Sequence, residues 1–333
     1  MTIPAVDNET QKDAKRRDMK TKSDNIATNL ALYSIIAYSY TWLSGLLIVL
    51  AGYPFDVILI VSIPGPLLGA VLVTLKENGV KGVRELFQGA FRWRFHPIWY
   101  LLAMLVPLSV FAIRSWLGIF VLGAEVPSNW FDSTFFTASI AGLTSLIVNG
   151  IGEEMGWRAF ALPRLQERLG SLGGSIVLGV IWAFWHTPAF FIPGSKQYGT
   201  SMFGYVLWIV SFTIIITALW NRAKGSVLVA IIMHETQNTI AFSMTSPSGT
   251  GIYADALWLL FALVFIALLP RPLVKLASPT EMRLEICPSC GARLRYTDEE
   301  FQTGRITCRN CRKPIDVSEA FLERNSSESQ YLF

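Results

Sequence analysis

Two adjacent carboxylates and an arginine follow an apolar run near the middle of the sequence, in the stretch GEEMGWRAF at residues 152–160. Glu154 and Arg158 are four residues apart, so on a helix they lie one above the other and can form an ion pair. Glu153 projects about 100° away on the same helix. The two acids therefore have different surroundings, which allows one carboxylate to act as a base while its neighbour has a structural role.

Two of the three histidines of the chain also lie in apolar runs. His234 and Asn238 are one helical turn apart and can face the same cavity, to which another run contributes His186. A carboxylate, two imidazoles and a carboxamide are the groups needed to activate a water molecule and to stabilise an oxyanion. Since no serine or cysteine accompanies them, the pattern favours hydrolysis by attack of water. The third histidine, His96, precedes Pro97 at an expected loop-to-helix junction and is interpreted as a solvated interfacial residue.

The composition places these residues in a membrane. Of 333 residues, 52% are hydrophobic and only 16% are charged, which is too little polar surface for a soluble globule. A transmembrane helix needs roughly 20 apolar residues. Windows of this kind begin near Asn29, Asp56, Pro97, Thr134, Ser171, Ser201, Gly225 and Ile252. The sequence predicts an all-α polytopic membrane protein with about eight transmembrane helices. Ionisable groups at the centre of such helices are costly, so each is a functional hypothesis.

Lysine and arginine are concentrated in alternate connections, which predicts that both termini face the cytoplasm. The basic connections are residues 12–22, 76–94, 158–168, 222–224 and 271–275. The connections around Tyr53, Pro127 and Ser248 have no basic residue. The net charge of +4 is therefore a topology signal and gives no reason to invoke nucleic acid. We expect an integral protein of a prokaryotic plasma membrane, in contact with the lipid bilayer.

The predicted domains are a mobile charged arm at residues 1–28, a membrane domain at 29–270, a cysteine-bearing domain at 280–318 and a flexible tail at 319–333. Apolar residues recur at helical spacing over residues 80–91, which predicts a short helix in the cytoplasmic interface. For the two carboxylates to meet His186, the helix that carries them must continue towards Pro163, and the next must begin only after Gly173-Gly174.

All four cysteines lie in the C-terminal domain, as Cys287, Cys290, Cys308 and Cys311. Two C-x-x-C pairs separated by 17 residues match the spacing of a tetrahedral zinc site. Disulfides are disfavoured in the reducing cytoplasm. Since so small a domain has little core, bound metal would supply its folding free energy. The segment resembles a zinc ribbon, and the partner of such a ribbon stays open.

Three motifs in order resemble the CPBP intramembrane proteases, also called Abi or CAAX prenyl endopeptidase-like proteins. They are Glu153-Glu154-x-x-x-Arg158, an aromatic-x-x-x-His block ending at His186, and His234-x-x-x-Asn238. The resemblance covers roughly residues 30 to 270. It implies that Glu153 and His186 activate the water, that His234 and Asn238 stabilise the oxyanion, and that Glu154 and Arg158 shape the site.

The resemblance also implies cleavage of a peptide bond in a membrane-associated or lipidated protein or peptide. One position departs from the motif, because Trp182 stands where the family usually has phenylalanine. We expect a reshaped pocket with the same chemistry. Two histidines and a glutamate can also hold zinc, so a catalytic metal stays open.

Two other classes of protein fit the same residues. A scaffold or immunity protein would use the carboxylates as a buried ion-pair cluster and the ribbon to recruit a partner. A transporter would use them as a proton relay. Arg114 and Glu235 are interpreted as partners in helix packing.

Overall fold

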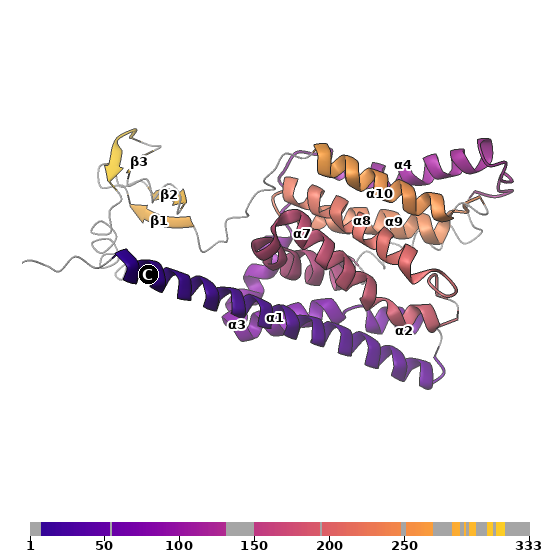
Figure 1. Ribbon diagram of the computed structural model, residues 1–333, viewed down its shortest axis with the longest axis horizontal. Coiled ribbons are helices and arrows are strands. Elements are labelled where there is room, and N and C mark those ends of the chain that lie inside the picture. The colour runs from indigo at the N-terminus through magenta and orange to yellow at the C-terminus, as the bar shows by residue number, and fades with distance from the viewer. Residues whose placement is uncertain are drawn as a thin grey trace, which may run out of the picture. The chain divides into compact units, whose positions relative to one another are not determined.

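The computed structural model describes residues 8–53, 55–130, 150–193, 195–247 and 251–268, and in the C-terminal part 282–286, 290, 293–297, 305–308 and 311–316. The chain divides into two compact units, Met1–Val274 and Lys275–Phe333. The first is helical and the second contains short strands (Figure 1). The predicted fold class, an all-α membrane protein with a small cysteine-bearing appendage, is confirmed.

Helices account for the described part of the first unit. They are α1 (Asn8–Leu50), α2 (Phe55–Ser62), α3 (Gly65–Ala90), α4 (Ile98–Phe120), α6 (Gly152–Glu154), the π-helix η2 (Met155–Ala161), α7 (Leu162–Trp185), the 3₁₀-helix η3 (Thr187–Phe191), α8 (Met202–Arg222), α9 (Val227–Ser243) and α10 (Gly251–Leu268).

Five helical stretches of the described chain are long and apolar enough to cross a membrane, and a shorter apolar helix covers Tyr253–Ile266. The five stretches are Asp24–Leu50, Ile60–Ala90, Ile98–Phe120, Gly152–Trp185 and Met202–Arg222. The expected count of eight is therefore not confirmed. The helix expected from Thr134 falls in residues 131–149, outside the described part of the chain.

The charged arm expected at the N-terminus is helical from Asn8 onward, as the first part of α1. In α3 the backbone leaves the helical conformation at Gly79, where φ is 63° and ψ is −162°. A left-handed φ of this kind is accessible to glycine without steric cost. Residues 80–90 then form a separate helical segment, where the sequence predicted a short interfacial helix.

Close backbone contact joins α1 to α3. A Cβ atom on Gly65 would lie 2.6 Å from the carbonyl oxygen of Ala37, and one on Gly69 would lie 2.9 Å from that of Tyr33. Gly65 and Gly69 form a G-x-x-x-G pattern, which lets two membrane helices approach closely. Helix α3 also packs against α6 and η2, the segment that carries the two glutamates.

Residues 152–185 form two arms that meet at Gly170, where φ is 69° and ψ is 175°. Behind this turn the chain folds back, since a Cβ on Gly174 would lie 3.0 Å from the backbone nitrogen of Gln166. The expectation that the second arm begins only after Gly173-Gly174 is therefore wrong by about one helical turn. The positive φ of the reversal is met at Gly170 instead.

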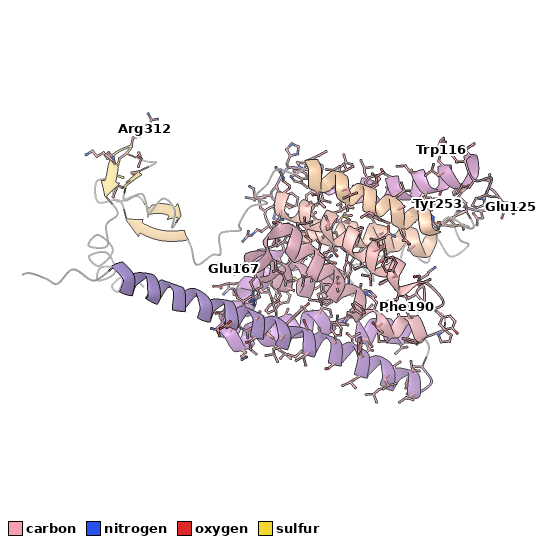
Figure 2. The ribbon with its side chains drawn as sticks, in the orientation of Figure 1. Trp116, Glu125, Glu167, Phe190, Tyr253 and Arg312 are labelled. Atoms are coloured by element: carbon pink, nitrogen blue, oxygen red, sulfur yellow. The ribbon has the colours of Figure 1, made fainter. Side chains whose placement is uncertain are left out.

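The remaining helices enclose this two-armed segment. Helix α7 packs against α8, α8 against α10, and α4 against α9 (Figure 1). A hydrophobic cluster of Ala90, Met155, Val227 and Ile231 joins α3, η2 and α9. Glu167 lies at one end of this helical unit, while Glu125 and Tyr253 lie at the other (Figure 2).

The second unit contains two antiparallel hairpins in its described residues. Strand β1 (Met282–Ile286) pairs with β2 (Arg293–Thr297), and β3 (Arg305–Thr307) pairs with β4 (Pro314–Asp316). In the register, Leu284 faces Arg295 and Ile306 faces Ile315. Each C-x-x-C pair of the sequence falls in the connection of one hairpin. Two hairpins with a cysteine pair at each connection are consistent with the zinc-ribbon resemblance.

Candidate active site

The two glutamates lie where a short α-helical stretch changes into a π-helix. Glu153 and Glu154 end α6, and η2 carries Arg158. π-Helical turns are rare and occur frequently at functional sites. The turn lies against the start of α3, because a Cβ on Gly156 would stand 2.6 Å from the carbonyl carbon and oxygen of Pro66. A glycine at this position is therefore needed for the close approach of η2 to α3.

Glu154 is the centre of a buried charge cluster. Its Oε1 accepts a hydrogen bond from Nη1 of Arg158 at 2.8 Å and one from Nδ1 of His234 at 2.8 Å. Both Glu154 and Arg158 are fully buried. The predicted ion pair between positions 154 and 158 is thus formed, and α9 contributes a third member that the spacing on one helix could not indicate.

Glu153 has a different partner. Its Oε2 accepts a hydrogen bond from the indole Nε1–H of Trp182 at 2.7 Å, and its side chain is buried. Among the described residues, no hydrogen bond reaches its other oxygen, Oε1. One oxygen of this carboxylate is therefore held in place, while the other is left for a further partner.

His186 follows the last turn of α7 and is half-buried. Its Nδ1 lies 2.9 Å from the carbonyl oxygen of Trp182. Because a carbonyl oxygen only accepts, Nδ1 must carry the hydrogen, and Nε2 of a neutral ring then has a free lone pair. The ring stands edge-on to Trp185 and Tyr205, with centroids 4.7 and 5.4 Å apart. These contacts fix both the orientation and the tautomer of the imidazole.

The turn at Gly170 explains how Glu153 and His186 come to the same region. They lie 17 and 16 residues from this glycine, on opposite arms. At a rise of about 1.5 Å per residue, two helical arms of similar length bring their ends to a similar depth. Trp182, one turn before His186, then reaches Glu153 through its side chain. The turn at Gly170 therefore allows the arm with the two carboxylates to meet His186 on the other arm.

Asn238 lies one turn beyond His234 on α9 and is half-buried. Its Nδ2 donates to Oε1 of Glu235 at 3.4 Å. Glu235 is buried beside His234, so the expectation that it acts as a packing partner of this helix agrees with its position. Asn238 is thus on the correct helix for the site, one turn from the histidine that Glu154 holds.

Helix α1 supplies contacts that the sequence reasoning missed. The hydroxyl of Tyr38 donates to the carbonyl oxygen of Ile181, and Nε1 of Trp42 donates to that of Trp185 at 3.0 Å. These two aromatic residues are four apart on α1 and hold the last turn of α7, immediately before His186. The i, i+4 spacing was the available signal for a shared target on a neighbouring helix.

The other polar residues singled out from the sequence lie elsewhere. Arg114 of α4 interacts electrostatically with Asp255 of α10, which agrees with a role in helix pairing. His96 is exposed, as expected of an interfacial residue. Arg164 pairs with Glu77 at 2.6 Å and ties α7 to α3.

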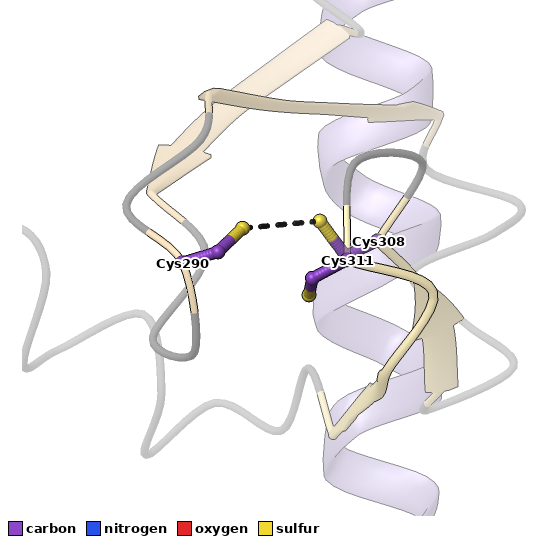
Figure 3. Close-up of side chains that lie close together, drawn as sticks. All are labelled: Cys290, Cys308 and Cys311. Atoms are coloured by element: carbon purple, nitrogen blue, oxygen red, sulfur yellow. Dashed lines mark hydrogen bonds between the residues drawn. The ribbon is translucent and has the colours of Figure 1, made fainter.

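Three cysteines converge in the second unit. Cys290, Cys308 and Cys311 have their sulfur atoms within 4.8 Å of one another (Figure 3). The sulfurs of Cys290 and Cys308 lie 3.7 Å apart. The backbone N–H of Cys308 donates to the carbonyl of Lys313, and that of Arg312 donates to Cys308. The fourth cysteine of the predicted site, Cys287, lies outside the described residues. The described thiols therefore form a group that could hold a metal ion.

The same proximity is not found at the membrane site. In the part of the chain that the structure describes, the cysteine group is the one set of three histidine, cysteine or carboxylate residues whose ligand atoms lie within 4.8 Å of one another. The glutamates and histidines on α6, α7 and α9 instead hold indole, guanidinium and backbone partners. These residues do not form a preassembled three-ligand metal site.

The fold and the site together define a polytopic helical membrane protein with a buried cluster of glutamate and histidine between its helices. Residues 135–240, which include all six site residues predicted from the sequence, match a family model described as Type II CAAX prenyl endopeptidase Rce1-like. The resemblance to the CPBP intramembrane proteases is thus confirmed for the segment that carries the site.

A curated relative gives the same result. CAAX prenyl protease 2 of Methanococcus maripaludis is 33% identical over 109 residues, which is 30% of this chain and 40% of that protein. The chain therefore aligns with less than half the length of this relative. The family-model match does not include the ribbon unit or α1.

Proposed function

We propose that this chain is an intramembrane endopeptidase, which hydrolyses a peptide bond of a membrane-associated or lipidated protein by attack of an activated water. The observation that carries the proposal is the different pairing of two adjacent carboxylates. Glu154 is balanced by Arg158 and His234, while Glu153 accepts only an indole N–H among the described residues. A carboxylate without a cationic partner is suited to accept a proton.

In the proposed reaction, the water gives a proton to Glu153 as its oxygen attacks the carbonyl carbon of the substrate. His186 holds the other hydrogen of the water through Nε2, because Nδ1 is bound to the carbonyl of Trp182. When the tetrahedral intermediate collapses, the C–N bond breaks and the proton on Glu153 passes to the leaving amine. The base thus becomes the acid of the second step.

The oxyanion is assigned to His234 and Asn238. For His234 to donate from Nε2 while Nδ1 donates to Glu154, the ring must carry both hydrogens. The carboxylate of Glu154 would balance the charge of that imidazolium. Asn238 needs only a rotation of its amide, since its contact with Glu235 is long. Donors of this kind contribute about a hundred- to a thousandfold to the rate of acyl transfer.

A water-filled cavity at the site is supported by its polar groups. Among the described residues, Oε2 of Glu154 and both Nε and Nη2 of Arg158 are buried without a protein partner. Buried polar atoms in native proteins are bonded to protein or to ordered water. The cluster has more polar groups than protein partners, as a hydrolytic site open to water would require.

The ribbon is proposed to hold a structural zinc ion through Cys287, Cys290, Cys308 and Cys311. Zn–S bonds of about 2.3 Å in a tetrahedron place neighbouring sulfurs roughly 3.8 Å apart. The 3.7 Å between the sulfurs of Cys290 and Cys308 agrees with this spacing and is far from a disulfide. Zinc analysis of the purified full chain, compared with Cys308→Ser, tests the assignment, and unchanged metal content in the variant would contradict it.

The orientation is proposed from the basic connections, with both termini in the cytoplasm of a prokaryotic cell. Arg92 donates to the carbonyl of Lys224, so the basic connections after α3 and after α8 lie at the same end of the helical unit. Positive residues at one end support a cytoplasmic assignment for it.

The experiment compares new protein termini in membranes of cells that carry wild type, Glu153→Gln or His186→Ala at matched expression. Termini that both variants lose would identify the substrate and support hydrolysis. Glu167→Gln, an exposed acid on α7, is the matched control and should keep the wild-type pattern. Identical profiles in every strain, with the cellular phenotype preserved in Glu153→Gln, would favour the scaffold class. Proton-coupled flux in proteoliposomes would favour the transporter.

A defined probe complements the cellular experiment. The curated relative is named as a CAAX prenyl protease, which suggests a prenylated cysteine followed by three C-terminal residues as the probe. We use a farnesylated, fluorescence-quenched peptide of this form, called the prenylated probe below. Cleavage of the prenylated probe but not of its unmodified counterpart would support recognition of the lipid.

A further inference from the structure

Trp182 contacts more members of the site than any other described residue outside the predicted set. It is buried on α7. It forms hydrogen bonds with Glu153 and His186. Its ring also contacts Arg158 and His234. Trp182 is not a reacting group in the proposed reaction, because an indole neither accepts nor gives a proton at neutral pH.

The indole N–H fixes the base. A carboxylate group rotates freely about its last torsion unless a partner holds it, since that torsion has a broad energy profile. The bond of 2.7 Å from Nε1 occupies Oε2 of Glu153 and so determines the direction of Oε1. Among the described residues, Glu153 accepts no hydrogen bond from a basic side chain, unlike Glu154.

The backbone of the same residue fixes the imidazole. The carbonyl oxygen of Trp182 accepts from Nδ1 of His186, which leaves Nε2 on the opposite side of the ring. One residue therefore orients both groups that are proposed to hold the water. A substitution of its side chain disturbs only the first of these bonds directly.

The ring of Trp182 also lies among the groups of the charge cluster. The guanidinium carbon of Arg158 stands 4.3 Å from the ring centroid, and the ring of His234 meets it edge-on at 5.1 Å. Phe212 of α8 stacks on it at 6.0 Å. The indole is thus held on several sides, so its N–H has a fixed direction towards Glu153.

We propose that Trp182 is a positioning residue, which aims the free oxygen of Glu153 at the water through its indole N–H. The proposal rests on the hydrolytic function proposed above. The competing interpretation is that Trp182 only fills space between α6, α8 and α9. Phenylalanine, which the family motif usually has at this position, would keep a ring face for Arg158 and lose the N–H. The space-filling interpretation therefore predicts wild-type kcat for Trp182→Phe, whereas the positioning role predicts a loss of kcat in this chain.

The test measures cleavage of the prenylated probe by the purified full chain. For Trp182→Phe we expect kcat to fall about ten- to a hundredfold, as for loss of a hydrogen bond to a charged group, with KM within about threefold. Trp220→Phe is the matched control, because Trp220 is equally buried and its Nε1 has no partner among the described residues. It should keep wild-type kcat.

A second substitution separates the hydrogen bond from the volume of the ring. Replacement of Trp182 by benzothienylalanine puts sulfur in place of the N–H group at nearly constant size. It should reproduce the loss of kcat, with a fall of the thermal midpoint no larger than that expected from the loss of one hydrogen bond. This analogue also provides the result if Trp182→Phe does not fold.

The outcomes are distinct. Wild-type kcat in the benzothienylalanine protein, with Glu153→Gln inactive, would overturn the role of Trp182 and leave the proposed function intact. Equal activity of wild type and Glu153→Gln, on the probe and in the termini of cellular proteins, would overturn the proposed function and this role with it. If the wild type cleaves cellular substrates but not the probe, the kinetic comparison is made on a peptide that spans the identified bond.

Discussion

Glu153 and Glu154 are neighbours in sequence, yet they are surrounded by groups of different charge. The carboxylate of Glu154 receives two donors from basic side chains, on its own helix and on α9. The carboxylate of Glu153 receives a neutral donor from α7. Two acids of one type can thus have two roles, because the charge of the nearest partner differs.

The substitution Glu154→Gln tests the structural role of Glu154. The amide keeps the size of the side chain but leaves Arg158 buried without its counter-charge. Removal of one partner of a buried pair costs about 3–5 kcal/mol in soluble proteins. We expect a clear drop of the thermal midpoint of the detergent-solubilised protein, and at least a tenfold loss of kcat, because His234 loses the carboxylate that holds it.

The control for this substitution is Glu85→Gln, which changes an exposed acid on α3 and should alter stability by less than about 0.5 kcal/mol. A wild-type midpoint for Glu154→Gln would show that another group, such as Glu153, balances Arg158. The division of roles between the two acids would then be wrong.

At the scale of the elements, the π-helix η2 packs closely against the start of α3, next to the two glutamates. Their contact depends on the missing side chain of Gly156, since a Cβ there would lie 2.6 Å from backbone atoms of Pro66. Backbone atoms cannot move aside as a flexible side chain can. The substitution of this one glycine therefore tests whether the η2–α3 contact positions the site.

For Gly156→Ala we expect a loss of about 1–3 kcal/mol of stability, as for overpacking in a core, together with reduced cleavage of the prenylated probe. The measurement is a thermal melt followed by kinetics on the same preparation. Gly89→Ala is the control, because a Cβ at Gly89 meets only the end of the Arg92 side chain, at 3.9 Å. Equal melts for the two variants would contradict the η2–α3 contact.

A second element-scale expectation concerns α1. Tyr38→Phe removes the hydroxyl that donates to Ile181 in the turn before His186. Loss of one such bond costs about 1 kcal/mol on average. We expect a small decrease of the thermal midpoint, whereas Tyr40→Phe, on another face of α1, should leave it unchanged. An unchanged midpoint for Tyr38→Phe would show that this bond does not stabilise the last turn of α7.

At the scale of the whole molecule, the chain consists of two units that hold their own structure by different means. The helical unit is stabilised by close helix packing and its buried ion pairs, while the small hairpin unit brings three described thiols together. Such a division predicts that the two units respond separately to loss of metal.

We therefore expect a chelator, or the Cys308→Ser substitution, to remove zinc from the full chain without changing the main thermal transition of the helical unit. Cleavage of the soluble prenylated probe should stay within about twofold of wild type, because all six predicted catalytic residues belong to the first unit. A parallel loss of zinc and of activity would contradict the independence of the two units.

Much of the architecture followed from local sequence patterns. Apolar runs of sufficient length predicted membrane helices, and the spacing of Glu154 and Arg158 predicted their ion pair. The two cysteine pairs predicted the convergent thiols. The helix count is not confirmed, because the run expected from Thr134 lies outside the described residues and because α9 and the apolar part of α10 are shorter than the five long apolar stretches.

The sequence by itself determined which groups are available for chemistry and in what order, together with the membrane as their environment. Only the tertiary structure decided which partner each group has. The bond from His234 to Glu154 joins residues 80 positions apart, and that from Trp182 to Glu153 joins residues 29 apart. Such bonds depend on how helices pack and on which way a side chain points. Neither is encoded in the periodicity of a single helix, so the assignment of base and structural acid required the folded molecule.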